Sequence, residues 1–251
     1  TCDLLDTIGI PYTILSRFKD KASVQIAKSV KNAIESKRPF ALLVENDVLS
    51  EYERVVKPVT KYKLNGEEAL KLVINSLSNS DIVIVTAGKL SRELFEYRES
   101  KKQSHKQDLL IVGGMGHASS IALSIAQQKP KEKVYCLDGD GALIMHMGAL
   151  ATIGDKGLKN FYHIVVNNGS HESVGGQLTA GFNINIPRIA RACGYTYAYS
   201  VDKTKQITDV LNSTRDLEGP ILIEIKVHTG SRKDLTRPTI NPAENKDAFI
   251  S

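Results

Sequence analysis

Two polar turns, each at the end of an apolar strand, constrain the fold of this chain more than any other feature. Residues 134–137 form an apolar run that leads into Asp138-Gly139-Asp140-Gly141, and residues 161–166 form a second run that leads into Asn167-Asn168. The 25 residues between Gly141 and Asn167 are enough for one helix and two loops, which predicts a crossover between parallel strands. A right-handed crossover brings the carboxyl ends of both strands together, at the place where open α/β sheets bind ligands.

The side chains expected at this meeting point are those of a site for a hard cation. The carboxylate of Asp140, the side-chain amide of Asn168 and a loop carbonyl would all offer oxygen atoms, which suit Mg²⁺ or Ca²⁺. Because Mg²⁺ usually completes its shell with phosphate oxygens and water, a phosphate-bearing ligand is expected beside it. A Gly-Asp-Gly sequence by itself also occurs as a simple turn, so the matched Asn-Asn pair carries the argument.

The rest of the chain predicts an α/β fold with a parallel sheet, because short β-branched runs alternate with helical patterns. Residues 1–60 hold one strand-helix-strand unit, with strands at 12–15 and 40–44, the second of them buried, and a helix at 22–36. Residues 45–64 are the expected linker, and Asn65 with Glu68 predicts a capping box at the next helix. About six parallel strands with helices on both faces are then expected, strands at 82–85, 109–112, 134–137, 161–166, near 197 and at 221–227, and helices at 91–98, 119–128, 145–153, 186–192 and 205–211. The tail after Gly230 is expected to be irregular.

Composition excludes several other classes of protein. The hydrophobic share of 41% and the charged share of 24% are ordinary for a globular chain. The net charge of +5 comes from scattered basic residues, and the densest stretch, residues 19–38, is interpreted as a solvated helix face, so no nucleic-acid partner is expected. No apolar run approaches the ~20 residues of a membrane span. Three cysteines without a Cys-x-x-Cys pair indicate reduced thiols, no zinc site and a cytoplasmic location.

Three stretches of sequence carry a resemblance to a known family. The spacing of Gly-Asp-Gly and Asn-Asn resembles the thiamine diphosphate signature, and residues 112–120, 167–177 and 230–238 together resemble phosphonopyruvate decarboxylase, whose close relative is sulfopyruvate decarboxylase. The resemblance implies that residues 1–60 are the C-terminal remnant of a pyrimidine-binding domain with its linker. Residues 61–251 would be a complete diphosphate-binding domain. Members of the family carry a further segment before the position of Thr1.

The resemblance also implies the cofactors and the residues that hold them. Thiamine diphosphate and Mg²⁺ are expected, with Asp140, Asn168 and the Ser170 carbonyl as metal ligands. The side chain at Met115 would wedge between the two rings of the cofactor, although an ordinary core methionine is the alternative. The hydroxyl of Ser91 would contact the cofactor, or would simply cap a helix. The full set of expected cofactor contacts is Gly88, Ser91, Gly113, Met115, Gly141, Ala142 and Ser173.

Catalytic and substrate-binding residues follow from the same resemblance. His171 and Glu172 directly follow the Asn turn and are expected near the reacting carbon, where an imidazole can move protons at neutral pH. A loop histidine with a structural hydrogen bond is the other interpretation of His171. A phosphonate dianion calls for guanidinium donors, for which Arg232 and Arg237 are the candidates. A solvated, charged tail, which also includes Lys233, is the alternative.

The implied function is that of a lyase, which converts 3-phosphonopyruvate to phosphonoacetaldehyde and CO₂ through thiamine diphosphate. It would act as a homo-oligomer with active sites between subunits. The Glu that activates the cofactor's aminopyrimidine is not expected in this chain, so this stretch alone would be catalytically incomplete. Its small-molecule substrate would be a 2-keto acid with a phosphonate group.

Three other functions stay open at this point. The first is a sulfopyruvate decarboxylase or an acetolactate-synthase-like enzyme with the same fold. The second is an NAD-dependent dehydrogenase, because Gly114-x-Gly116-x-x-Ser119 and Asp138 match a dinucleotide fingerprint in outline. Against it, a ribose-binding acid needs neither a second acid two residues later nor a downstream Asn-Asn. The third is a cofactor-binding subunit without catalytic activity.

Overall fold

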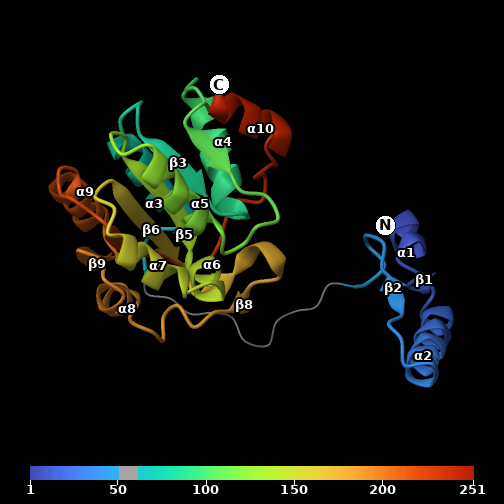
Figure 1. Cartoon of the computed structure of the whole chain (residues 1–251). Helices are drawn as coiled ribbons and strands as arrows, with labels where there is room; N and C mark the ends of the chain where they lie inside the picture. The colour runs from blue at the N-terminus through green and yellow to red at the C-terminus, as the bar shows by residue number, and fades with distance from the viewer. Residues whose placement is uncertain (51–61) are drawn as a thin grey trace. The chain divides into compact units, whose positions relative to one another are not determined.

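The computed structural model describes residues 1–50 and 62–251, which belong to two compact units, residues 1–57 and 58–251. The boundary expected between residues 60 and 61 lies outside the described residues. Figure 1 shows the helices and strands of both units, most of them labelled.

The smaller unit is a single strand-helix-strand unit preceded by a short helix. Its elements are α1 (Cys2–Thr7), β1 (Tyr12–Ile14), α2 (Lys19–Ser36) and β2 (Ala41–Leu43). The strands β1 and β2 pair in parallel, as predicted, whereas α1 was not predicted. The second strand was expected to be buried, and this is wrong: its residues are half-buried and Val44 beyond it is 47% exposed. Two strands and one long helix do not enclose a core, and Val24 and Ile34 of α2 are exposed.

The larger unit is built on a six-stranded parallel sheet with the strand order β4-β3-β5-β6-β10-β9. The predicted α/β fold with about six parallel strands is therefore confirmed. After β3 the chain first adds β4 on one side and then crosses to add β5 on the other, which places a topological switch point between β3 and β5. The bounds of the strands are β3 (Ile82–Val85), β4 (Asp108–Leu110), β5 (Val134–Gly139), β6 (Phe161–Asn167), β9 (Tyr197–Val201) and β10 (Ile221–Lys226).

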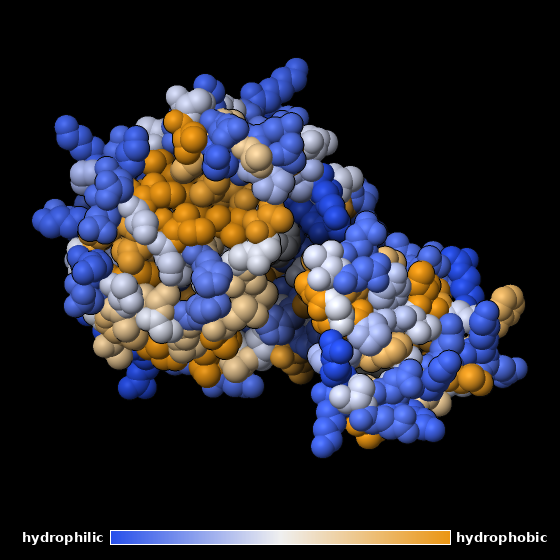
Figure 2. Space-filling model, turned by 45° about the vertical axis from the view of Figure 1, so that its right-hand side comes forward, coloured by the Kyte–Doolittle hydropathy of each residue, from blue (hydrophilic) through white to orange (hydrophobic). Residues whose placement is uncertain are grey.

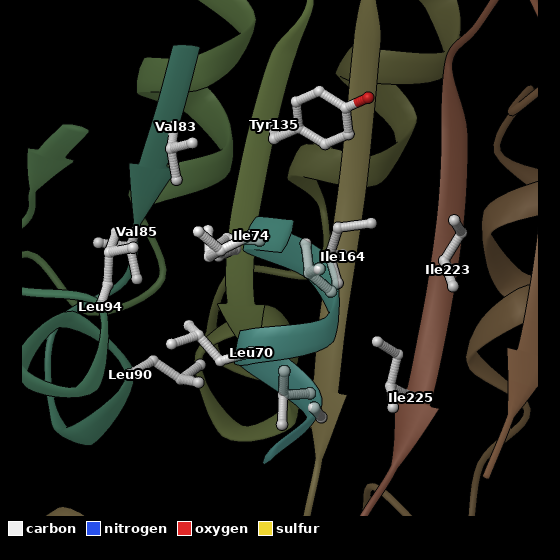
Figure 3. Packing of buried hydrophobic residues seen from close by; sticks show 14 of the residues in the cluster. Leu70, Ile74, Val83, Val85, Leu90, Leu94, Tyr135, Ile164, Ile223 and Ile225 are labelled. Carbon is white, nitrogen blue, oxygen red and sulfur yellow. The ribbon is translucent and has the colours of Figure 1, made fainter. Parts of the chain in front are cut away.

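Helices cover both faces of this sheet and bury a hydrophobic core on each side. One face packs against α3 (Gly66–Ser76), α4 (Lys89–Ser100) and α9 (Thr204–Thr214), and the other against α5 (Ala118–Gln128), α7 (Ala149–Lys156) and α8 (Ile186–Ala192). Figure 3 shows Leu70 and Ile74 of α3 among the strand residues of the first core. The first turn of α3 has the predicted capping box, because Asn65 and Glu68 each accept a hydrogen bond from the other's backbone N–H.

Several predicted elements were wrong or incomplete. The helix expected at residues 145–153 is two helices, α6 (Asp140–Met145) and α7, and α6 begins directly after β5. A small hairpin of β7 (Ser170–His171) and β8 (Gln177–Leu178), with a 3₁₀ turn at Glu172–Val174 called η1, follows β6 and was not predicted. The tail contains α10 (Pro242–Ile250), not only irregular chain.

The helix α10 has a structural role at the edge of the sheet. Asn245 accepts a hydrogen bond from the Leu110 N–H at 2.8 Å and donates one to the Asp108 carbonyl at 3.0 Å. Its side-chain amide therefore pairs backbone groups that an edge strand such as β4 leaves open.

The surface of the larger unit is not uniformly polar. Figure 2 shows hydrophobic side chains gathered in a hollow on one face of it. No helix in the described part of the chain is both long enough and apolar enough to cross a membrane.

Candidate active site

The acidic turn (Asp138-Gly139-Asp140-Gly141) and the Asn turn (Asn167-Asn168) meet at the carboxyl ends of β5 and β6, as predicted from the sequence. Gly139 is paired with Val166 in the parallel register, so the two strands end side by side. Asp140 is the first residue of α6 and is 1% exposed. The backbone N–H of Asn168 donates to Asp140 Oδ1 at 3.3 Å. One carboxylate oxygen of Asp140 therefore faces the Asn turn directly.

The second carboxylate oxygen of Asp140 is held by a segment that the sequence did not indicate. The hydroxyl of Thr179, which follows β8, donates a hydrogen bond to Asp140 Oδ2. Gly181 lies so close that a Cβ there would be 3.0 Å from the Asp140 Cβ and 2.6 Å from Asn167 Oδ1. The hairpin after β6 thus folds back over the acidic turn, and only a residue without a side chain fits at 181.

The two asparagines of the Asn turn have different tasks. Asn167 is fully buried, and its amide donates to the Gly181 carbonyl at 2.8 Å and to Glu224 Oε1 at 2.7 Å. Asn168 instead lines the pocket described below, and its Oδ1 accepts a hydrogen bond from the Ser170 N–H at 3.0 Å. Asn167 therefore fixes the loop, while Asn168 lines the same pocket as Asp140.

The electrostatics around Asp140 fit a bound cation. Burial raises the pKa of this carboxyl, and the hydrogen bonds from Thr179 and from the Asn168 backbone oppose that rise. Among the described residues, no lysine, arginine or histidine forms an ion pair with Asp140. A buried carboxylate is stable only when it is paired or coordinates a metal, and carboxylate, amide and carbonyl oxygens are the ligands that Mg²⁺ takes.

A pocket of about 90 Å³ opens beside Asp140, and most of the predicted site residues line it. We call it the Asp140 pocket. Thr86, directly after β3, also lines it, and its buried hydroxyl has no hydrogen-bond partner among the residues that the structure describes. An unpartnered buried hydroxyl is the kind of group that a polar ligand satisfies. The predicted residues in this lining are Met115, Asp140, Gly141, Ala142, Asn168, Ser170, His171, Glu172 and Ser173.

Four more of the predicted site residues line a second pocket, of about 310 Å³, which we call the Arg237 pocket. Ala87 belongs to both linings. The predicted residues found here are Gly88, Ser91, Gly113 and Arg237, and Arg92 is an addition that was not predicted.

The turn between β3 and α4 differs in one detail from what the sequence predicted. The helix α4 begins at Lys89 with Gly88 as its N-cap, and the Ser91 hydroxyl donates back to the Gly88 carbonyl at 3.0 Å. Ser91 is therefore not the helix cap that the alternative interpretation expected. Gly88 has a φ of +114° and lies close to Ser173, because a Cβ at 88 would be 3.4 Å from the Ser173 hydroxyl.

His171 and Glu172 lie at the pocket, and each is fixed by its neighbours. The His171 ring packs on the backbone of Gly141 so closely that a Cβ at 141 would be 2.6 Å from it. Glu172 accepts hydrogen bonds from the Asn168 side-chain amide at 2.8 Å and from the Gly230 N–H at 2.5 Å. Lys89 bridges the same group, 3.8 Å from Glu172 and 2.6 Å from the Ser231 hydroxyl. Glu172 thus connects the Asn turn to the C-terminal tail.

Arg232 is in the lining of neither pocket. Its guanidinium forms ion pairs with Glu67 of α3, at 3.0 Å, and with Glu96 of α4. Thr236 also binds Glu96, through its backbone N–H at 2.7 Å and through its hydroxyl. Arg232 therefore fastens the tail to two helices, while Arg237 is exposed at the second pocket.

One further acidic residue of the Asp140 pocket was missed by the sequence interpretation. Glu93 of α4 is 4% exposed and lines the pocket. Burial, with smaller contributions from Glu67 and Glu172, raises the pKa of Glu93 to about 7. No local pattern could reveal this, because Glu93 looks like any helix-surface glutamate until the sheet and the tail are in place.

Comparison with known proteins decides which family this site belongs to. The family of the thiamine pyrophosphate enzymes, C-terminal TPP binding domain, matches residues 86–225. The chain belongs to this family. The match runs from the residue directly after β3 into β10, and the same match excludes the dehydrogenase alternative.

Individual relatives agree with the family. Phosphonopyruvate decarboxylase of Streptomyces viridochromogenes is 29% identical over 97% of this chain and 64% of its own length. Sulfopyruvate decarboxylase subunit beta of Methanococcus maripaludis is 30% identical over 75% of this chain and 97% of its own length. The thiamine diphosphate-dependent 4-hydroxybenzoylformate decarboxylase of Rhodococcus jostii RHA1 shares the fold, with a TM-score of 0.56, 19% identity, and coverage of 73% of this chain and 36% of that one. The chain thus spans less than two thirds of the phosphonopyruvate decarboxylase that it matches.

Proposed function

We propose that the protein that contains this chain binds thiamine diphosphate with Mg²⁺ and decarboxylates 3-phosphonopyruvate to phosphonoacetaldehyde and CO₂. The observation that carries the proposal is that the backbone of Asn168 contacts the buried carboxylate of Asp140, which forms no ion pair among the described residues, in a chain of the TPP-binding family. The relationship to phosphonopyruvate decarboxylase along 97% of the chain supports the substrate.

The proposed metal ligands are the Asp140 carboxylate, the Asn168 amide oxygen and the Ser170 carbonyl. The Thr86 hydroxyl and the backbone at Gly141 and Ala142 would hold the diphosphate group. Gly88, Ser91, Gly113, Met115 and Ser173 complete the proposed cofactor contacts. Thiamine diphosphate, when bound, supplies the nucleophile and the electron sink that decarboxylation of a 2-keto acid needs.

The protein's own residues would position the substrate and move protons. His171 is the proposed proton donor and acceptor, because its ring lies at the Asp140 pocket against Gly141. Glu172 would act through Asn168, since its carboxylate accepts from the amide N–H of Asn168 and so turns the amide oxygen away from itself. Arg92 and Arg237 of the Arg237 pocket are proposed to bind the phosphonate group. Arg232 would serve the substrate only after release from Glu67 and Glu96.

The substrate is tested by comparing 3-phosphonopyruvate with sulfopyruvate. Steady-state decarboxylation by the full-length gene product should show a kcat/KM at least tenfold higher for the phosphonate. A preference for sulfopyruvate would reassign the substrate and leave the cofactor site intact. Binding of the cofactor without turnover of either 2-keto acid would favour the non-catalytic subunit.

The proposed assembly is a homo-oligomer with active sites between subunits. The Glu that activates the aminopyrimidine would come from a pyrimidine-binding domain outside this chain, and residues 1–60 would be the end of such a domain. Light scattering on the full-length protein should show a dimer or a higher oligomer at working concentrations. A monomer with full activity would contradict this arrangement.

A further inference from the structure

We propose that Glu93 is a cofactor-positioning residue: its carboxyl group keeps a proton when the Asp140 pocket binds the cofactor's diphosphate and donates it as a hydrogen bond to that anion. Cofactor binding would then be coupled to proton uptake by Glu93. This inference rests on the proposed function, because it concerns the same pocket and ligand.

Glu93 lines the Asp140 pocket from α4. Glu93 is 4% exposed, it lines the pocket together with Asp140, and in the described part of the chain no hydrogen bond or ion pair involves its carboxylate. A Cβ at Gly66, the first residue of α3, would lie 3.8 Å from Glu93 Oε2 and 3.8 Å from the side chain of Val166. The carboxyl group therefore lies between the start of α3 and the end of β6, where the Asn turn begins.

The charged groups near Glu93 lie on α3, α4, η1 and the C-terminal tail. Glu67 of α3 and Glu172 of η1 disfavour its ionised form, whereas Lys89 of α4 and Arg232 of the tail favour it. Both cations are already engaged, Lys89 with Glu172 and Ser231, and Arg232 with Glu67 and Glu96. Burial contributes most, and together these effects raise the pKa of Glu93 to about 7.

The chemistry of the ligand determines which form of Glu93 is compatible with binding. An ionised Glu93 would add a further negative charge to a pocket that already contains Asp140 and Glu172, and would repel a diphosphate. A protonated Glu93 is neutral and can donate a strong hydrogen bond to a phosphate oxygen. Diphosphate binding should therefore hold the proton on Glu93 to higher pH.

The experiment compares full-length wild type with Glu93→Gln and Glu93→Met by titration with thiamine diphosphate at saturating Mg²⁺, from pH 6 to pH 8.5. The dissociation constant of the wild type is divided by that of Glu93→Gln at each pH. In this quotient the effects of the cofactor's own phosphate and of the other titrating groups in the pocket cancel. With a pKa of about 7, this quotient should rise about 30-fold over that range, because binding requires one extra proton only in the wild type. Glu99→Gln, an exposed carboxyl on the same helix, is the matched control and should follow the wild type.

The Met variant separates removal of charge from loss of the hydrogen bond. It should lack the wild-type pH dependence, like Glu93→Gln, but bind about tenfold more weakly than Glu93→Gln, because Met cannot donate to the phosphate. Calorimetry in buffers of different ionisation enthalpy should show that, on binding thiamine diphosphate at pH 8, the wild type takes up about one proton more than either variant does.

The outcomes separate the two proposals. A wild type that does not bind thiamine diphosphate at any pH would overturn the proposed function and this inference with it. A wild type that binds with a quotient independent of pH would overturn the role of Glu93 alone. If Glu93→Gln does not fold, the quotient of wild type and Glu93→Met decides in the same way. If neither variant folds, the absence of any proton uptake by the wild type at pH 8 overturns the inference.

Discussion

Replacement of Gly181 by alanine should disable the proposed metal site, because the new methyl group would displace the Asp140 carboxylate. A Cβ at 181 would lie 2.6 Å from Asn167 Oδ1 and 3.0 Å from the Asp140 Cβ, and it would overlap the Asp140 carboxylate as well. Real Cβ atoms essentially never come closer than 3.0 Å to these neighbours. The Asp140 carboxylate is also tied to Thr179, two residues away from the new methyl group, so it has little freedom to yield.

The size of the expected loss of affinity follows from the small displacement of its ligands that a metal site tolerates. Relief of the overlap to an ordinary contact requires a shift of several tenths of an ångström, whereas metal–ligand distances tolerate only about ±0.2 Å. Loss of correct ligand orientation typically weakens metal binding by about 10- to 100-fold. We therefore expect Mg²⁺-dependent binding of thiamine diphosphate to weaken by that factor in Gly181→Ala.

The assay is a calorimetric titration of the full-length protein with thiamine diphosphate at fixed Mg²⁺, with thermal unfolding recorded in parallel. Gly148→Ala is the matched control, because a Cβ there meets nothing within 4 Å. It should bind as the wild type does. Wild-type affinity in Gly181→Ala, or an equal loss in Gly148→Ala, would refute the reasoning.

Three further predictions concern residues other than the proposed metal ligands. Arg98→Leu should lower the free energy of unfolding by about 3–5 kcal/mol, because it leaves the buried carboxylate of Asp108 without its two hydrogen bonds from Arg98. The double variant Arg98→Leu/Asp108→Leu should recover most of this loss in urea unfolding. Equal losses in the single and the double variant would contradict this prediction. Because the fold raises the pKa of Glu93 from 4.5 to about 7, the folded state binds this proton more tightly than the unfolded state does. The free energy of unfolding should therefore fall as the pH rises from 4.5 to 7 and then stay level. Glu93→Gln should remove that fall and gain up to about 3 kcal/mol at pH 8 in chemical denaturation, and an unchanged pH profile would count against it. Glu172→Gln should weaken Mg²⁺-dependent cofactor binding about tenfold in the same calorimetric titration, because an amide cannot accept from both Asn168 and Gly230 through two oxygens; wild-type affinity would show that this bridge is dispensable.

The sequence predicted those parts of the fold that depend on local pattern. The capping box at Asn65 and Glu68 and the βαβ alternation needed only neighbouring residues, and they gave α3 and the parallel sheet. The meeting of Asp140 and Asn168 was predictable because a right-handed crossover leaves little choice of geometry.

One error came from a signal that was present but not used. The C-terminal tail was interpreted from its polarity, although Asn241, Pro242 and Glu244 form a complete helix start, with a cap, a proline at the first position and a capping-box glutamate. Local chemistry would have predicted α10.

The remaining misses depend on contacts between distant residues. Thr179 reaches Asp140 across 39 positions through a small hairpin, and Arg232 reaches Glu67 across 165. No periodicity or spacing encodes such pairs, because they arise only after the sheet has assembled and the chain has folded back over its edge. The same holds for Glu93, whose burial depends on the start of α3 and on the end of β6.

The most direct test of the proposed site measures whether Asp140 carries the metal that holds the cofactor. The full-length wild type is titrated with thiamine diphosphate in Mg²⁺ and in EDTA, beside Asp140→Ala and the control Asp155→Ala, whose side chain is 76% exposed on α7. Binding should require Mg²⁺ in the wild type and in Asp155→Ala, and should be lost in Asp140→Ala while its circular dichroism stays native. Metal-dependent binding of unchanged affinity in a folded Asp140→Ala protein would contradict the account.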